Sequence, residues 1–124
     1  MTFDKFTIKA QEVVQEAVNT AQMNGQQTIE PIHVLKGILT KAKDVSTFIF
    51  QKLGVNANQV AMLVDQEIQH LPKVQGGQPY LSNDANSVLT KAMDTAKQMG
   101  DEFVSVEPIL LALLTVNSTA SRIL

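Results

Sequence analysis

Apolar residues near the start of the chain recur at intervals of three and four positions. Between Thr7 and Gly25 they fall on one side of a helix, and they are Ala10, Val13, Val14, Ala17, Val18 and Ala21. This spacing is typical of a helix with one buried face. Thr7 is suited to cap the amino-terminal end, and Gly25 can end the helix in a left-handed turn. We therefore predict a helix between these two residues.

The same pattern returns 75 positions later. Aligned without gaps, residues 6–49 and 81–124 are identical at 10 of 44 positions. Ser82 and Gly100 take the places of the cap and the end of the helix. The second apolar face consists of Ala85, Val88, Leu89, Ala92, Met93 and Ala96. A long unit that occurs twice favours a duplicated domain over an open solenoid, which needs about three or more units.

Three further helices are predicted in the first unit. One begins at Glu30-Pro31, because proline is tolerated in a first turn; its inward face is Val34, Leu35, Ile38 and Leu39. The next ends at Gly54, and its inward face is Val45, Phe48, Ile49 and Leu53. The last opens at Asn56 and turns inward Val60, Leu63, Val64, Ile68 and Leu71. No segment shows a strand pattern.

Two prolines and a glycine pair between positions 71 and 79 indicate a linker. We therefore predict an all-α fold, with two pseudo-twofold-related four-helix repeats packed into one globular domain over residues 1–124. Repeat one spans 1–71, the linker 72–80 and repeat two 81–124. The counterpart of Phe50 would lie beyond Leu124, so repeat two is expected to lack its last helix, and the chain to stop short of the natural domain end.

Charge and composition narrow the possible functions. The formal charge is −2, the basic residues are scattered and tryptophan is absent, so we expect no nucleic-acid partner. Cysteine is absent, which excludes disulfides and thiolate chemistry. Asp4, Lys5 and Lys9 interrupt the first residues, so no signal peptide or membrane span is expected. A cytoplasmic, membrane-free protein fits this composition.

Catalytic and metal chemistry are not supported by the motifs. His33 and His70 have no second ligand at helical spacing, so no metal site is expected. No nucleophile or acid–base constellation can be assembled, and no phosphate-binding loop occurs. We expect a domain that is not an enzyme and binds no cofactor.

Several segments resemble the Clp amino-terminal domain family, and the resemblance covers the whole chain. They are Met1–Thr7, Ile29–Leu35, Leu71–Val74 and Gly100–Glu107, and they are similar to the ClpB branch in particular. ClpC-type relatives typically carry a Gly-Thr-Glu-His motif in each repeat. Here Ile32 stands at the first Glu position, and Glu107 is followed by Pro108, which favours the ClpB branch.

The resemblance implies a mobile domain that captures apolar segments of unfolded or aggregated polypeptides for a hexameric ATPase. The motor would lie beyond residue 124 and would hold the ATP and magnesium. It would also form the homohexamer and work with a DnaK-type chaperone system, while the isolated domain is expected to be monomeric.

Six residues are candidates for substrate binding. Thr7, Asp101 and Glu107 match positions tied to chaperone function in the family, and Leu81, Leu89 and Pro108 could line an apolar groove with one edge of the apolar segment 109–114. Each polar residue also has a structural explanation, namely a cap, a turn and the positive end of a helix. For the helix at 109–114, burial in the core is the alternative.

Two other functions stay open on the sequence. The domain could dock a folded adaptor for a ClpC- or ClpA-type protease regulator, in which case it would bind one partner tightly. A small helical enzyme is the third class, and the absence of catalytic constellations argues against it.

Overall fold

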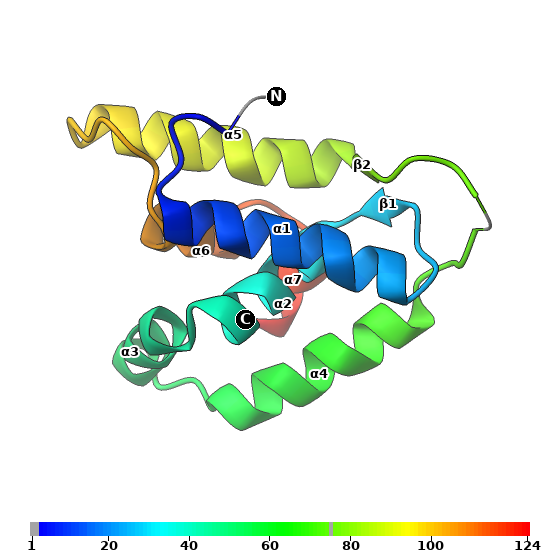
Figure 1. The fold of residues 1–124 in the computed structure, drawn as a ribbon. Coiled ribbons are helices and arrows are strands. Elements are labelled where there is room, and N and C mark those ends of the chain that lie inside the picture. Colours follow the sequence, from blue (N-terminus) through cyan, green and yellow to red (C-terminus); the bar gives the residue numbers. More distant parts are fainter. Residues whose placement is uncertain (1–2, 75) are drawn as a thin grey trace.

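The computed structural model describes residues 3–74 and 76–124, and that part of the chain folds into seven helices (Figure 1). In chain order they are α1 (Ile8–Met23), α2 (Pro31–Lys41), α3 (Lys43–Leu53), α4 (Ala57–His70), α5 (Asn83–Gln98), α6 (Val106–Thr115) and α7 (Thr119–Ile123). Two strands of two residues each, β1 (Thr28–Ile29) and β2 (Tyr80–Leu81), precede α2 and α5. The predicted all-α class is confirmed.

The first helix of each unit begins and ends at equivalent positions. The Thr7 hydroxyl accepts a hydrogen bond from the Ala10 amide at 3.2 Å, and the Ser82 hydroxyl accepts one from the Ala85 amide at 3.0 Å. At the other ends, Gly25 and Gly100 have φ values of 67° and 76°. These are the caps and left-handed turns that the sequence predicts.

The two units are joined by a reciprocal pair of short parallel contacts. β1 pairs with β2, which places Ile29 opposite Leu81. Phe6, which precedes α1, pairs in the same way with Val104, which precedes α6. In both contacts, the segment before the first helix of one unit pairs with the segment before the second helix of the other unit.

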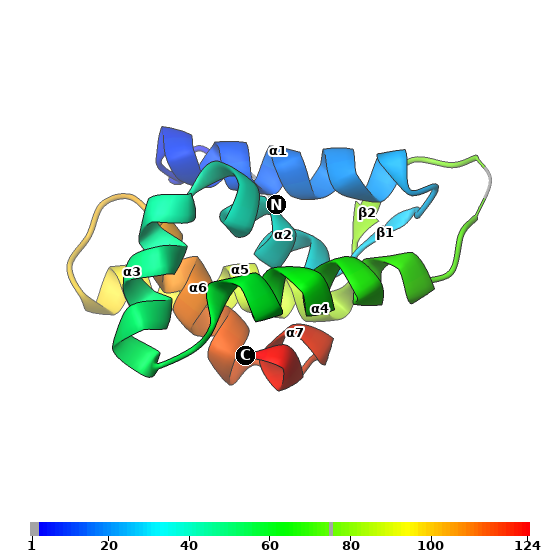
Figure 2. The same cartoon turned by 90° about the horizontal axis from the view of Figure 1, so that it is seen from below.

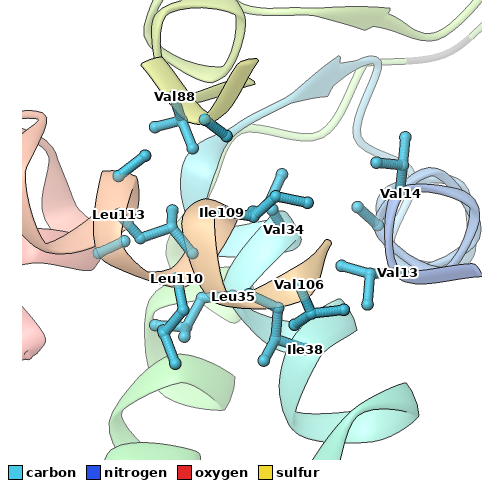
Figure 3. Close-up of a cluster of buried hydrophobic side chains, with 14 of the residues drawn as sticks. Val13, Val14, Val34, Leu35, Ile38, Val88, Val106, Ile109, Leu110 and Leu113 are labelled. Carbon is cyan, nitrogen blue, oxygen red and sulfur yellow. The ribbon is translucent and has the colours of Figure 1, made fainter. Parts of the chain in front are cut away.

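The core lies where the two units meet. α1 packs on α2, α5 packs on α6, and α2 contacts helices of both units. Figure 3 shows their apolar side chains interleaved, with Val13, Val34, Leu35 and Ile38 facing Val106, Ile109, Leu110 and Leu113. Each fully buried Val, Leu or Ile contributes about 1.5–3 kcal/mol to stability. Neither unit can bury this surface without the other.

The inward face of α3 differs from the prediction. Phe50 and Ser46 are buried, while Phe48 is 59% and Leu53 is 52% exposed. Phe48 and Phe50 are two positions apart, about 200° around the helix, so they lie on opposite sides of it, and Leu53 is the last helical residue. Figure 2 shows α3 at one end of the molecule, followed by the connection to α4. On α4, Val60, Val64 and Ile68 are buried as predicted, whereas Leu63 is 38% exposed because it lies at the edge of the apolar stripe.

The prediction that no strand forms was also wrong. Tyr80, which the sequence placed in the linker, is the first residue of β2. Strands of two residues are too short to produce an alternating pattern, so the sequence carried no signal for them. Among the described residues, no helix has the length and apolar character needed to cross a membrane.

Candidate functional site

Thr7 ties the start of α1 to the second unit. Its side chain caps α1, and its backbone amide donates a hydrogen bond to the carbonyl oxygen of Val104 at 2.9 Å. Val104 lies midway between Asp101 and Glu107 in the chain. This bond fixes the start of α1 to the segment that joins α5 to α6.

Asp101 follows the turn that ends α5. The Gly100 amide bonds to the Lys97 carbonyl at 3.1 Å, and the Asp101 amide bonds to the Ala96 carbonyl at 2.9 Å. These two bonds form a Schellman motif. The Asp101 side chain is exposed, and so is that of Glu102. We call residues 99–102 the Gly100 turn.

Glu107 is exposed in the first turn of α6, where its negative charge complements the positive end of the helix dipole. The next residue, Pro108, is buried. On the same helix Ile109, Leu110 and Leu113 are fully buried, while Leu111 is 46% exposed. The apolar segment is therefore mainly core, with one exposed edge.

Leu81 and Leu89 do not meet the polar candidates at an open surface. Leu81 is half-buried in β2, opposite Ile29. Leu89 is 0% exposed, on the face of α5 that packs into the core. In this conformation the Leu89 side chain cannot touch a ligand, and the assignment of the six residues to substrate binding stays a prediction.

A groove next to the Gly100 turn includes Asp101. Its volume is about 240 Å³, and it is lined by Lys5, Met93, Ala96, Lys97, Asp101, Glu102 and Val104. We call it the Gly100 groove. Beside it, Phe103 is 47% exposed and the Lys5 ammonium lies 6.0 Å from the centre of its ring. Apolar side chains thus form the floor, and two cations and two carboxylates stand at the rim.

Of the residues that line this groove, the sequence suggested only Asp101, whose role in binding stays a prediction. A signal was present in the repeat itself, because Asp101, Glu102 and Phe103 stand where the first unit has Gln26, Gln27 and Thr28. Two carboxylates and an aromatic ring here replace the two amides and the hydroxyl of the first unit. This difference indicates that the surface has diverged between two units that share the same backbone arrangement.

His33 is held in a buried chain of hydrogen bonds. The Glu30 amide donates to Nδ1 of His33 at 2.9 Å, so Nε2 carries the proton and donates to Oε1 of Gln26 at 2.7 Å. Nε2 of Gln26 in turn donates to the carbonyl oxygen of Ile68 at 2.6 Å. Burial lowers the pKa of His33 to about 4. The imidazole is therefore neutral and joins α2 to the end of α4.

Residues 3–74 and 76–124 contain no group of three or more His, Asp or Glu side chains placed to hold a metal ion. Both ring nitrogens of His33 already have protein partners. Beside the Gly100 turn the surface has an apolar groove with a charged rim.

Comparison with known proteins gives close relatives along the whole chain. A chaperone protein ClpB of Bacteroides thetaiotaomicron is 61% identical over 124 residues, which are 100% of this chain and 14% of that relative. A chaperone protein ClpB of Porphyromonas gingivalis is 44% identical over the same share of each chain. The chain thus spans about one seventh of the length of these relatives.

Solved structures show the same fold at lower identity. The Hsp104 N-terminal domain from Candida albicans matches with a TM-score of 0.83 and 22% identity, covering 97% of this chain and 79% of that one. The N-terminal domain of the ClpV1 ATPase from E. coli matches with a TM-score of 0.84 and 18% identity, covering 98% of this chain and 72% of that one.

The family model that describes the Clp repeat N-terminal domain matches residues 5–124. The resemblance inferred from the sequence is therefore confirmed, and so is its direction towards ClpB. The chain belongs to the Clp repeat N-terminal domain family, and its similarity within that family is to ClpB chaperones.

Proposed function

We propose that this chain is the substrate-binding domain of a ClpB-type, ATP-dependent chaperone, and that it captures exposed apolar segments of unfolded or aggregated polypeptides. The observation that carries the proposal is 61% identity, over the whole chain, with a ClpB chaperone. The domain itself is proposed to be non-catalytic. ATP, magnesium, the homohexamer and the DnaK-type partner system belong, in this proposal, to the rest of a longer cytoplasmic protein.

The surface supports this proposal physically. Met99, Phe103 and Leu111 are between 46% and 66% exposed, and charged side chains surround the Gly100 groove. Loose apolar contacts accept many sequences, whereas a pocket of directed hydrogen bonds would select one. Ordering a flexible segment costs conformational entropy, so we expect dissociation constants in the micromolar range or weaker.

Docking of a folded adaptor, as in a ClpC-type regulator, has less support. In the first unit the position of the family's glutamate is occupied by Ile32, which is 2% exposed. In the second unit Glu107 is exposed, but a buried proline follows it. The two units therefore do not expose carboxylates at both of these equivalent positions.

The proposal can be tested by titrating the isotopically labelled chain with casein, which has no stable fold, and following backbone amide shifts by NMR. We expect fast-exchange shifts that saturate at micromolar to millimolar casein. Folded lysozyme serves as the control and should cause no shifts. Equal shifts with both proteins, or none with casein at millimolar concentration, would contradict the proposed function.

A further inference from the structure

One peptide bond of the chain joins an asparagine to a glycine, and it lies where the linker passes the end of α1. Asn24 is the only one of the seven asparagines that is followed by glycine. This dipeptide is especially prone to spontaneous deamidation, because glycine has no side chain to shield its backbone nitrogen. We propose that Asn24 is a deamidation site, and that the attachment of the linker to the end of α1 controls how fast it reacts.

The reaction consumes water and releases ammonia. The backbone nitrogen of Gly25 attacks Cγ of Asn24, and the new carbon–nitrogen bond closes a five-membered imide ring. The bond between Cγ and Nδ2 breaks, and Nδ2 leaves as ammonia with the proton of the Gly25 amide. Water then adds to one of the two ring carbonyl groups and opens the ring. The product at position 24 is aspartate or isoaspartate, and the reaction needs neither an oxidant nor a cofactor.

The folded chain holds Asn24 in a conformation that cannot close this ring. Its ψ angle is 9°, so the Gly25 nitrogen eclipses the backbone nitrogen of Asn24. Cβ is another substituent of the same carbon atom, and it is therefore turned away from the attacking nitrogen. Nδ2 of Asn24 also donates to the carbonyl oxygen of Thr20 at 2.8 Å, which fixes the side chain. The peptide group between Asn24 and Gly25 must rotate before the reaction can start.

That peptide group is held at both of its polar atoms. Its N–H donates to the carbonyl oxygen of Gln22 at 3.1 Å, and its carbonyl oxygen accepts from Nζ of Lys73 at 3.1 Å. The next carbonyl oxygen, that of Gly25, accepts from the Val74 amide at 2.9 Å. Figure 1 shows the connection that leaves α4 and passes this end of α1. Rotation about ψ of Asn24 breaks the first two bonds together, so the linker restrains the reactive peptide.

The second unit forms the same turn without an asparagine. Met99 precedes Gly100 there, and the two backbone bonds of the Gly100 turn have counterparts 75 positions earlier, at Gly25 and Gln26. The turn therefore does not require asparagine at this position. Among the hydrogen bonds of the described residues, none ends on the carbonyl oxygen of Met99. The linker is thus attached to the unit that carries the reactive dipeptide.

Deamidation should loosen the same junction. A carboxylate at position 24 lies at the negative end of the α1 dipole, and it cannot donate the bond that Nδ2 makes to Thr20. The Lys73 ammonium beside it offsets part of the added charge. Isoaspartate also inserts one carbon atom into the backbone, which displaces the Gly25 carbonyl oxygen from the Val74 amide. The modified chain is therefore expected to hold its linker less firmly.

The test is mass spectrometry of the 124-residue chain after incubation in mildly alkaline buffer, with and without urea. Trypsin releases the fragment from Ala10 to Lys36, which contains Asn19 as an internal reference, and a sample digested without incubation gives the background. Deamidation at position 24 should be at least about tenfold slower in the folded chain, because the peptide can rotate only when the junction opens. Asn19, inside α1, should stay unmodified in the folded sample.

Matched variants test the role of the linker. Lys73→Gln removes the cation that holds the Asn24 carbonyl oxygen. The folded variant should deamidate about two- to tenfold faster, which is the effect of one hydrogen bond on the opening equilibrium, whereas its rate in urea should be unchanged. Lys91→Gln makes the same substitution on the exposed surface of α5 and should change neither rate. Thr7→Ala weakens the opposite end of α1 and controls for a general loss of stability.

Each part of the proposal can fail separately. Equal rates in buffer and in urea, or no reaction at position 24 in urea, would overturn the assignment of Asn24 as a site that the fold controls. An unchanged rate in folded Lys73→Gln, or an equal acceleration by Lys91→Gln or Thr7→Ala, would overturn the role of the linker. Hydrogen exchange of the Val74 amide should be faster in the deamidated chain, and unchanged exchange would contradict the loosening of the junction. Thermal unfolding establishes that each variant is folded.

Discussion

The backbone amide of Thr7 bonds to the carbonyl oxygen of Val104 at 2.9 Å, near the opposite end of the chain. The equivalent bond of the second unit joins the backbone amide of Ser82 to the carbonyl oxygen of Ile29 at 3.0 Å. In each case a residue that caps a first helix is also fixed by the other unit. The structural and the functional explanations of Thr7 therefore need an experiment that separates them.

Thr7→Ala should destabilise the domain by about 1 kcal/mol, because the Ala10 amide loses its cap. Ser82→Ala removes the equivalent cap and should cost a similar amount. Urea unfolding measures both changes. If Thr7 also contacts substrate, only Thr7→Ala lowers casein affinity; equal affinities would assign Thr7 a purely structural role.

Acidification should destabilise the fold through His33. Its pKa is lowered to about 4 in the folded chain, against an ordinary value of 6.5. Below pH 6.5 the unfolded chain binds a proton that the folded chain does not, so the free energy of unfolding falls until about pH 4 and then levels. The loss is about 3 kcal/mol. Urea unfolding at several pH values measures it.

The control for this prediction is His33→Gln, which removes the titrating group. The variant is expected to be less stable at neutral pH, because the bonds to Glu30 and Gln26 are disturbed. Its stability should fall less steeply between pH 6.5 and 4 than that of the unmodified chain. Parallel curves would show that His33 does not carry the effect.

Adjacent leucines on α6 should differ sharply. Leu110→Ala should cost about 2–5 kcal/mol, because a fully buried side chain leaves a cavity. Leu111→Ala should cost less than about 1 kcal/mol, since 46% of Leu111 is already exposed. Thermal or urea unfolding distinguishes them, and a similar loss from both would contradict the burial of this helix.

Gly37→Ala should destabilise the domain although alanine favours helices. A Cβ atom at Gly37 would collide with the carbonyl oxygen of Val13, so α1 and α2 could no longer approach as closely. The equivalent position in α6 is already Ala112. Ala112→Gly is the control and should cost about 1–2 kcal/mol, through helix propensity and the loss of one buried methyl group. A more stable Gly37→Ala variant would refute the close contact.

Much of the architecture follows from local patterns. The first helix of each unit, its cap and its terminal glycine could be predicted, because the apolar period and the capping residues agree. The inward face of α3 could not. Phe48 and Phe50 are both large and apolar, and only the packing of α3 on its neighbours decides that Phe50 is buried and Phe48 is exposed.

The site was predictable only in part. A backbone bond brings Thr7 to Val104, which lies between Asp101 and Glu107 in the chain, but of these three residues only Asp101 lines the Gly100 groove. Leu89 was chosen as a groove residue from its apolar character, which does not distinguish a core side chain from an exposed one. The Gly100 groove needs Lys5 beside Val104, and that contact joins distant parts of the chain, so no local pattern indicates it.

The two reciprocal contacts, β1 with β2 and Phe6 with Val104, also affect how the chain folds while it is being synthesised. α1 and α2 leave first, but Phe6 has no pairing partner until Val104 has been synthesised. Closing contacts between distant parts of a chain is slow compared with helix formation. During translation the first unit must therefore persist with an open edge and part of its apolar face uncovered. The domain is proposed to bind proteins that expose apolar surface, and it exposes such a surface itself during its own synthesis.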